Sequence, residues 1–389
     1  MATETKQPGS EDQQQNSGGE KKQASKGRQP RNVPKPQFTD AEAGALEFPS
    51  SDSRAYNYFE PARQRASVYE DVTVDVQPDP ARHLTQGWVY GFADRDGGYP
   101  AEWTALKSTD WHAFRDPNGE WEKTIYQNNA AVVRQNSQNI ANAQSENVFV
   151  RWTDEWKEVV EKDVSAWMHP EHGLGMHVFI PAQRDAPTNM INNAISVNSM
   201  HKLRFAQDIA MYNLAITDTV EGFDGRAHMA AWQEDPKWQG VRENAENLTA
   251  IRDWAEAVVA ANLVFEPLVG ELFRGEFVMH IAASNGDFVT PTLMGLGESD
   301  FERDLGYTKV LLGLLVEDKE HGDANKELLS EWLAKYVPMS IAAIEPLEPM
   351  WSHAKQNGGG PSYEESVNNV KERAKAIYSE LELQAPKEL

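Results

Sequence analysis

The chain has 389 residues, of which 40% are apolar and 25% are charged; it contains no cysteine and carries a formal net charge of −23. Such an acidic chain is unsuited to binding nucleic acid or an anionic membrane, because contacts to phosphates require concentrated Lys and Arg. The lack of cysteine excludes disulfides, thiolate nucleophiles, Cys-ligated zinc and ordinary iron–sulfur clusters. Length and apolar content predict one large domain with appendages, or two domains.

The first 36 residues contain no aromatic side chain and very few apolar ones. Such a segment cannot bury enough surface to offset the entropy lost on ordering, so we expect a disordered tail over residues 1–36. No apolar stretch typical of a signal peptide precedes the helical part. The longest apolar run, VLLGLLV at 310–316, is too short to span a bilayer. We therefore expect a cytoplasmic protein.

Residues 37–108 lack a helical pattern and are predicted to form an extended, aromatic-rich arm. VTVDVQPDP (72–80) alternates Val with polar residues and predicts a short extended segment. GWVYGFADRDGGYPAEW (87–103) then combines four Gly with five aromatic residues. Irregular segments of this kind wrap over a surface and anchor by their rings. That surface can belong to the chain itself or to a partner, and the sequence leaves both open.

Helical periodicity follows from about residue 109 to 352, after a possible N-cap at Ser-Thr-Asp (108–110). Apolar residues recur every three or four positions in three stripes, which is the amphipathic period. The stripes are Ile191, Ile195, Phe205, Ile209, Tyr212 and Ile216; then Leu248, Ile251, Trp254, Val258, Ala261, Phe265, Leu268 and Leu272; and then Leu328, Leu329, Trp332 and Tyr336. We expect breaks at 169–173, 234–240, 284–291 and 320–325, and a kink at Pro267.

A Gly-rich linker (353–361) leads to a last predicted helix over 362–389, where Ser362 and Glu365 form a capping box. The predicted fold is all-α: a ferritin-like helical bundle with an extended N-terminal arm and a separate C-terminal helix. The predicted segments are 1–36, 37–108, 109–352, 353–361 and 362–389.

A metal site is the first chemical hypothesis for a long helical chain. Di-iron carboxylate bundles take one Glu from each of two helices and a Glu-x-x-His pair from each of two more. Of the ten His, only His321 follows an acidic residue, Asp318, by three positions, and it lies in a polar stretch at a helix end. The sequence therefore lacks this pattern where a buried site would need it.

The segment ELFRGEFVMH (271–280) still places Glu276 and His280 four residues apart, on one face of a helix expected to be buried. No second pair of matching geometry accompanies them, so a structural pairing is favoured over an iron ligand. An alternative is an independent ferritin-like oxidase or iron-binding protein using Glu266, Glu271, Glu276 and His280. Its three carboxylates are five residues apart, and side chains at this spacing point to different faces of an α-helix. The spacing therefore argues against this alternative.

Other catalytic motifs are missing from the sequence. There is no H-E-x-x-H, no G-x-S-x-G elbow, no P-loop and no G-x-G-x-x-G. HGLGMH (172–177) contains two glycines close to a proline and is interpreted as a helix break.

Asn198, His201 and Asp208 lie near the apolar face of their helix, and polar groups facing a core need partners. A buried polar network is favoured there over a degenerate metal site or a subunit contact.

Four segments together resemble a known family: YEDVTVDVQPDP, STDWHAFRDPNGEW, SNGDFVTP and EWLAKYVPMSIAAIEPL, in this order. Over about residues 63–352 the chain is similar to the β (small) subunits of the hydroxylases of soluble di-iron monooxygenases, which oxidise methane, propane, toluene or phenol. The propane group is the nearest in this resemblance. It implies a ferritin-like fold and a non-catalytic role, with ELFRGEFVMH at the position of a metal-bearing helix but without its ligands.

The resemblance also implies partners and cofactors. It implies an α2β2-type complex in which the α subunit carries the di-iron centre and this chain has no catalytic, cofactor-binding or metal-binding residue. NADH is used through a separate reductase, and a coupling protein binds transiently. The arm at 88–103 is expected to pack on the α subunit. The substrate hydrocarbon, a γ subunit and the docking sites of the other components are not determined by the sequence.

Overall fold

The computed structural model describes residues 61, 63, 66–74, 76, 103–356 and 359–389, and every regular element within them is a helix. The predicted all-α class is therefore confirmed. The predicted tail, nearly all of the aromatic arm and part of the Gly-rich linker lie outside the described residues, and the segment boundaries stay predictions. In the described part of the chain, each helix is too short or too polar to cross a lipid bilayer.

The helical unit is built from long helices joined by short turns. The α-helices are α2 (Glu122–Ser145), α3 (Asp154–Val159), α4 (Met168–Gly173), α5 (Ile180–Asp185), α6 (Asn189–Thr217), α7 (Ala227–Glu234), α8 (Pro236–Thr249), α9 (Trp254–Val259), α10 (Thr290–Val316), α11 (Gly322–Ile344), α12 (Ser352–Gln356) and α13 (Tyr363–Glu380). The π-helical segments are η1 (Glu70–Val74), η5 (Val160–Val164), η6 (Leu174–Phe179), η7 (Ala260–Gly270) and η8 (Leu272–Met279). Short 3-10 turns are η3 (Trp111–Ala113), η4 (Phe149–Arg151), η9 (Ala282–Asn285) and η10 (Glu345–Trp351).

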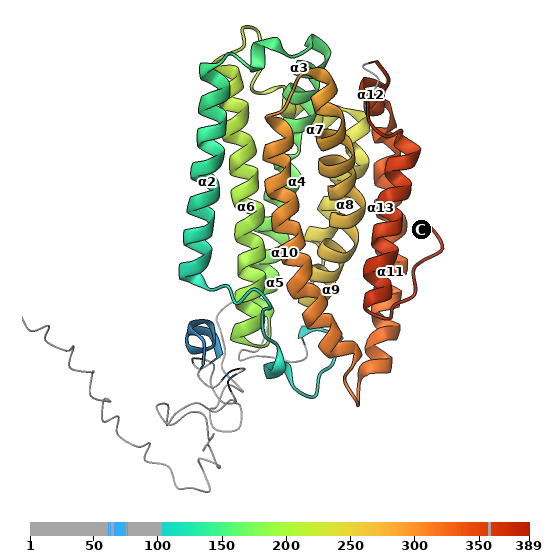
Figure 1. Ribbon diagram of the computed structural model, residues 1–389. Helices are drawn as coiled ribbons and strands as arrows, with labels where there is room; N and C mark the ends of the chain where they lie inside the picture. The colour runs from blue at the N-terminus through green and yellow to red at the C-terminus, as the bar shows by residue number, and fades with distance from the viewer. Residues whose placement is uncertain (1–60, 62, 64–65, 75, 77–102, 357–358) are drawn as a thin grey trace, which may run out of the picture. The chain divides into compact units, whose positions relative to one another are not determined.

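The long helices lie side by side as a bundle (Figure 1). Helix α6 packs against α2, against α4 and η6, and against α10. The continuous run η7–η8 packs against α10, α11 and α13. The predicted C-terminal helix is present as α13, but it ends at Glu380 and packs on the bundle instead of standing apart from it. Its Tyr378 hydroxyl donates a 2.8 Å hydrogen bond to the Leu263 carbonyl of η7.

The predicted apolar stripes form the core. All six residues of the first stripe are buried along α6, as are Ala261, Phe265, Leu268 and Leu272 of the second. The second stripe is divided between two helices, because α8 ends at Thr249 and α9 begins at Trp254. Four fully buried tryptophans, Trp156, Trp167, Trp238 and Trp254, supply much of the core volume.

Most predicted helix ends are confirmed. The breaks at 234–240, 284–291 and 320–325 each separate two helices, although α8 already begins at Pro236. The Ser362–Glu365 capping box is present, with both reciprocal hydrogen bonds formed. Asp110 caps only the short turn η3, and the first long helix begins at Glu122.

The predicted break at 169–173 is wrong, because the chain is continuously helical from α4 through η6. The two glycines of HGLGMH were taken as helix breakers, but Gly175 serves close packing. A Cβ at Gly175 would lie 2.8 Å from Cγ of Leu203 on α6. The Ser199 hydroxyl donates a 2.9 Å hydrogen bond to the Gly175 carbonyl. Glycine here lets two helices approach closely, which local sequence reasoning cannot distinguish from a break.

The predicted extended segment at 72–80 is also wrong where it can be compared. Val72 and Val74 belong to the π-helical turn η1, and the rest lies almost entirely outside the described residues. Ser67 and Glu70 form a reciprocal cap: Glu70 N donates to Ser67 Oγ (3.1 Å), and Ser67 N donates to Glu70 Oε2 (2.7 Å). This S-x-x-E signature favours a helical turn over the alternation of valines.

Pro267 does not interrupt its helix. It lies inside the π-helical segment η7, and the chain stays helical into η8. A proline removes one backbone donor and crowds the carbonyl four residues earlier, and a wider π turn accommodates both.

Candidate functional site

The centre of the bundle contains a closed ring of four buried charged side chains: Glu171 from α4, Lys202 from α6, Glu266 from η7 and Arg274 from η8. The Lys202 ammonium lies 2.6 Å from Glu266 Oε1 and 3.1 Å from Glu171 Oε2. The Arg274 guanidinium lies 2.7 Å from Glu266 Oε2 and 3.0 Å from Glu171 Oε1. Each carboxylate therefore bridges the same two cations, one with each oxygen.

The surroundings of this charged ring hold Arg274 in a fixed position. Its Nε donates to Glu298 Oε1 on α10 at 2.6 Å, and its guanidinium carbon lies 5.6 Å from the centre of the Trp167 ring. The Trp167 indole N–H donates to Glu171 Oε1 at 2.8 Å. A Cβ at Gly270 would lie 2.8 Å from Arg274 Nη1, so the absence of a side chain there makes room for the guanidinium. Every polar end of the arginine is matched by a carboxylate, as a buried charge requires.

The two carboxylates differ in their protonation equilibria. Burial opposes ionisation of Glu266, but Arg274 and Lys202 outweigh it and lower the pKa of Glu266. Burial raises the pKa of Glu171, and the attraction of Lys202 does not fully offset it. The cations lie closer to Glu266, at 2.6 and 2.7 Å, than to Glu171, at 3.1 and 3.0 Å, and the charge of Glu266 further raises the pKa of Glu171.

A second polar layer lies one helical turn along α6 and η7. Asn198 and His201 on α6 both bind Asp304 of α10, with His201 Nδ1 at 2.8 Å from Oδ1 and Asn198 Nδ2 at 2.8 Å from Oδ2. Asn262 of η7 donates to Asn198 Oδ1 at 2.8 Å, and the Tyr307 hydroxyl donates to the same oxygen at 2.9 Å. All five side chains are buried, so the predicted buried polar network is confirmed.

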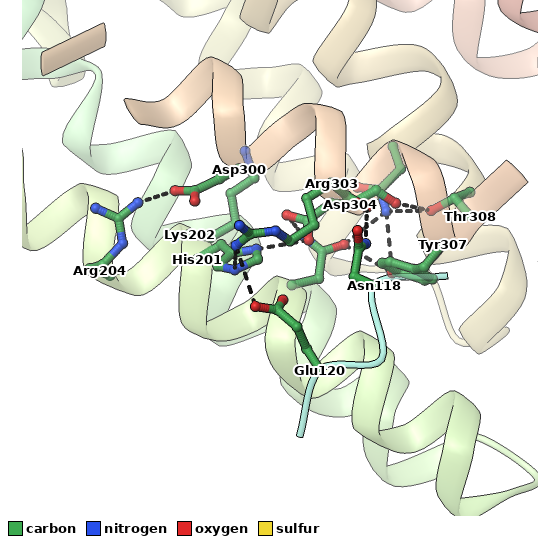
Figure 2. A network of polar contacts seen from close by, with 12 residues as sticks. Asn118, Glu120, His201, Lys202, Arg204, Asp300, Arg303, Asp304, Tyr307 and Thr308 are labelled. Carbon is green, nitrogen blue, oxygen red and sulfur yellow. Dashed lines mark hydrogen bonds and ion pairs between the residues drawn. The ribbon is translucent and has the colours of Figure 1, made fainter. Parts of the chain in front are cut away.

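Figure 2 shows Arg303 and Glu120 beside His201 in this layer. Arg303 Nη1 lies 3.3 Å from His201 Nε2 and 3.6 Å from Glu120 Oε1, and its side chain is partly exposed. Burial alone would lower the pKa of His201, but the carboxylate of Asp304 raises it above its ordinary value. The third predicted residue, Asp208, contacts Arg204, which also contacts Asp300.

The Glu276–His280 pair lies at the rim of the core and not on a fully buried helix face, because the Glu276 side chain is 16% exposed. The imidazole is 54% exposed, and its Nδ1 lies 3.8 Å from Glu276 Oε2. Glu276 Oε2 also accepts a 3.1 Å hydrogen bond from Asn369 on α13. Glu271 binds Arg373 Nε at 2.7 Å. The structure therefore does not bring Glu266, Glu271, Glu276 and His280 together.

The step of five residues that argued against this alternative assumed an α-helix. The segment is π-helical, in which residues five apart lie closer to one face. Spacing therefore does not separate Glu266, Glu271 and Glu276, whereas their different partners do.

The residues at the centre do not fit a di-metal site of the carboxylate type. Such a site needs its carboxylate oxygens free to coordinate metal and two imidazoles beside them. Here Lys202 and Arg274 contact all four oxygens of Glu171 and Glu266, and the only imidazole of the second layer, His201, binds Asp304. Among the described residues no three His, Asp or Glu side chains converge in a way that could hold a metal ion.

Sequence reasoning missed most of the charged ring. Glu171 lay in the supposed break at 169–173, and Arg274 lay unnoticed between Glu271 and Glu276. A signal was present in Asn198-x-x-His201 and Asp304-x-x-Tyr307, which have the i, i+3 spacing of a Glu-x-x-His pair with other side chains. These pairs belong to the second layer, of which sequence reasoning found Asn198 and His201 but missed Asp304 and Tyr307.

The sequence pattern of the Methane/Phenol/Alkene Hydroxylase family matches residues 88–319 of the chain. The propane 2-monooxygenase hydroxylase component small subunit of Mycolicibacterium smegmatis is 54% identical over 359 residues, which cover 92% of this chain and 97% of that protein. Its counterpart in Rhodococcus jostii is 52% identical over the same shares of the two chains. The methane monooxygenase component A beta chain of Methylosinus trichosporium is 27% identical, covering 84% of this chain and 86% of that one.

Solved structures agree with the fold. The structure of xenon-pressurized phenol hydroxylase from Pseudomonas sp. OX1 superposes with a TM-score of 0.69 at 19% identity, covering 85% of this chain and 98% of that chain. Toluene 4-monooxygenase gives a TM-score of 0.60 at 24% identity, covering 64% and 82%. At these identities the likeness concerns the ferritin-like helical fold alone.

Proposed function

The chain belongs to the Methane/Phenol/Alkene Hydroxylase family as a hydroxylase small subunit, and from this premise we propose that it is the non-catalytic β subunit of an NADH-dependent hydrocarbon monooxygenase. Its role is to support and dimerise a larger α subunit that holds the di-iron centre. The propane 2-monooxygenase relatives favour propane or another small alkane as the substrate of the complex.

One observation carries the non-catalytic role. The two carboxylates at the centre of the bundle are bridged by Lys202 and Arg274, which are cations of the chain itself. A di-iron centre at these two carboxylates would need their oxygens for metal ions. We therefore assign the iron to another subunit of the hydroxylase, with electrons from NADH supplied through a separate reductase and a coupling protein that binds transiently.

The surface of α2 and α6 supports a large protein partner. Met211 and Leu214 on α6 are each 51% exposed, and Tyr126 and Val133 on the neighbouring α2 are exposed as well. Helix α2 lies at one side of the bundle beside α6 (Figure 1). Of its 24 residues only Glu122, Lys123 and Arg134 are charged, in a chain of which 25% is charged. Exposed, charge-depleted helix surface is typical of the central part of a protein interface.

The iron content of the chain, expressed alone in iron-rich medium, tests this function. We expect close to no iron per chain, together with poor solubility that improves when the large subunit is co-expressed. About two irons per chain, the complement of a bundle di-iron site, would overturn the non-catalytic role. The hydroxylase complex purified in parallel serves as the positive control for iron loading. Among the described residues no contact favours the alternative of an independent oxidase, because Glu266, Glu271 and Glu276 have three different sets of partners.

A further inference from the structure

The geometry of the charged ring resembles that of two carboxylates bridging a pair of metal ions. Glu171 and Glu266 each place one oxygen on Lys202 and the other on Arg274, at 2.6 to 3.1 Å. The two carboxylates balance the two cations within this buried ring, and the partly exposed Glu298 adds a third carboxylate on Arg274 Nε. A carboxylate bundle with bound metal reaches the same balance with ions from solution.

We propose that Lys202 and Arg274 are internal counter-cations at a two-carboxylate centre, and that the Lys202 ammonium occupies the position of a divalent cation and keeps such a cation out. The centre is thus a cation site filled by side chains of the protein itself rather than an ordinary ion pair. This inference goes beyond the proposed function. It rests on that function in one respect, which is that the unaltered chain binds no metal.

Lys202 is the cation that an ion could replace, because fewer contacts fix its side chain than fix Arg274. Arg274 is fixed by Glu298, by the Trp167 ring and by the space left at Gly270. Lys202 contacts only the two carboxylates through its ammonium. Glu171 Oε2 has no hydrogen bond of good geometry, and its ion pair with Lys202 at 3.1 Å is its one charged contact. Removal of the ammonium would leave Glu171 Oε2 and Glu266 Oε1 facing the same space.

The class of ion follows from these ligands. Two carboxylate oxygens, with water completing the coordination, suit a hard divalent cation such as Mn²⁺. Lys202→Met keeps an apolar stem that ends one atom short of the ammonium nitrogen. Methionine is unbranched and flexible, so its terminal methyl can turn aside and leave room for an ion between the two carboxylates.

The test measures Mn²⁺ binding to the full chain by the loss of the free-ion electron paramagnetic resonance signal, with thermal unfolding as a second readout. We expect Lys202→Met to bind one Mn²⁺ per chain at least tenfold more tightly than the unaltered chain. We also expect Mn²⁺ to raise the unfolding temperature of the variant only, because a ligand that binds only the folded state stabilises it. A folded Lys202→Met chain that binds Mn²⁺ no better than the unaltered chain would overturn the proposal.

Three controls locate the bound ion. Lys202→Arg keeps a cation in place and should bind no Mn²⁺. Glu171→Gln in the Lys202→Met background should lose the binding, and an unchanged affinity there would contradict the proposed ligands. His280→Asn in the same background should change nothing, because Glu276 and His280 form a separate pair at the rim of the core.

Lys202→Met leaves a buried negative excess, so it can fail to fold without metal. Recovery of folded chain only when Mn²⁺ is present during expression would support the proposal. Lys202→His supplies a further variant, since imidazole can carry a positive charge in the absence of metal or coordinate Co²⁺ between the two carboxylates. If both variants stay unfolded with and without metal, an ion cannot replace the ammonium and the proposal is wrong. Iron in the unaltered chain would instead overturn the proposed function.

Discussion

Two glutamates on the continuous run η7–η8 show how the same chemical group takes different roles. Glu266 is fully buried and bound by two cations at 2.6 and 2.7 Å. Glu276, ten residues further along, has a hydrogen bond from Asn369 and an exposed His280 at 3.8 Å. Sequence reasoning drew attention to the second glutamate, because it has a histidine four residues away.

The difference lies in solvation. A carboxylate at the surface keeps much of its hydration, so its partners contribute little to stability. A carboxylate in a dry core has lost that hydration and depends on its partners to remain ionised. The importance of a charged residue in this bundle is therefore set by burial and by charges from other helices, and not by its nearest neighbours in the sequence.

The largest expected effect comes from removing one charge at each of these two positions. Glu266→Gln leaves Lys202 and Arg274 with a single carboxylate between them, and we expect a loss of about 3–5 kcal/mol in the free energy of unfolding. The matched change Glu276→Gln should cost less than about 0.5 kcal/mol. Urea unfolding of the two full-length variants measures both. Equal losses of stability in the two variants would show that burial does not set the contribution of these glutamates.

A pH experiment on Glu271, which lies between Glu266 and Glu276 in the sequence, sharpens the comparison of buried and partly exposed carboxylates. Burial raises the pKa of Glu271 to about 7 although Arg373 opposes the shift. The folded chain then holds a proton that the unfolded chain has lost between about pH 4.5 and 7, so this residue makes stability fall as pH rises through that window. Glu271→Gln removes the dependence, and the stability of the variant relative to the unaltered chain should rise by about 3 kcal/mol from pH 4 to pH 8.

Thermal or urea unfolding at several pH values measures this difference. Arg373→Gln is the opposite control: it removes the cation that lowers the pKa of Glu271 and should extend the fall in stability to higher pH. A Glu271→Gln variant with the unaltered pH profile would show that this carboxyl is as well hydrated as a surface group.

The two glycines of HGLGMH give the smallest and most closely matched comparison. Gly175→Ala would place a Cβ 2.8 Å from Leu203 Cγ, and we expect it to cost about 1–3 kcal/mol. Gly173→Ala meets nothing within 4 Å at an ordinary helical backbone conformation, so it should stabilise the chain by about 0.5–1 kcal/mol. Opposite signs in thermal unfolding are expected. A stabilising Gly175→Ala would mean that η6 and α6 pack less closely than described.

Sequence patterns were sufficient to predict features that depend only on residues close to one another in the chain. The period of Ile191, Ile195 and Ile209 identified the buried face of α6, and the cap at Ser362 identified the start of α13. The buried network around Asn198 and His201 was also found, because polar side chains beside an apolar stripe need partners. The same local rules failed at Gly175, where the constraint comes from another helix.

By itself the sequence determined the all-α class, the main buried faces, the absence of cysteine chemistry and the lack of a Glu-x-x-His pair at a buried position. These follow from composition and from periods of three and four residues, which depend only on near neighbours. The tertiary structure alone decided that Glu171, Lys202, Glu266 and Arg274 form one charged ring. These four residues are spread over about a hundred positions, and their ionisation depends on hydration lost only when the helices pack together.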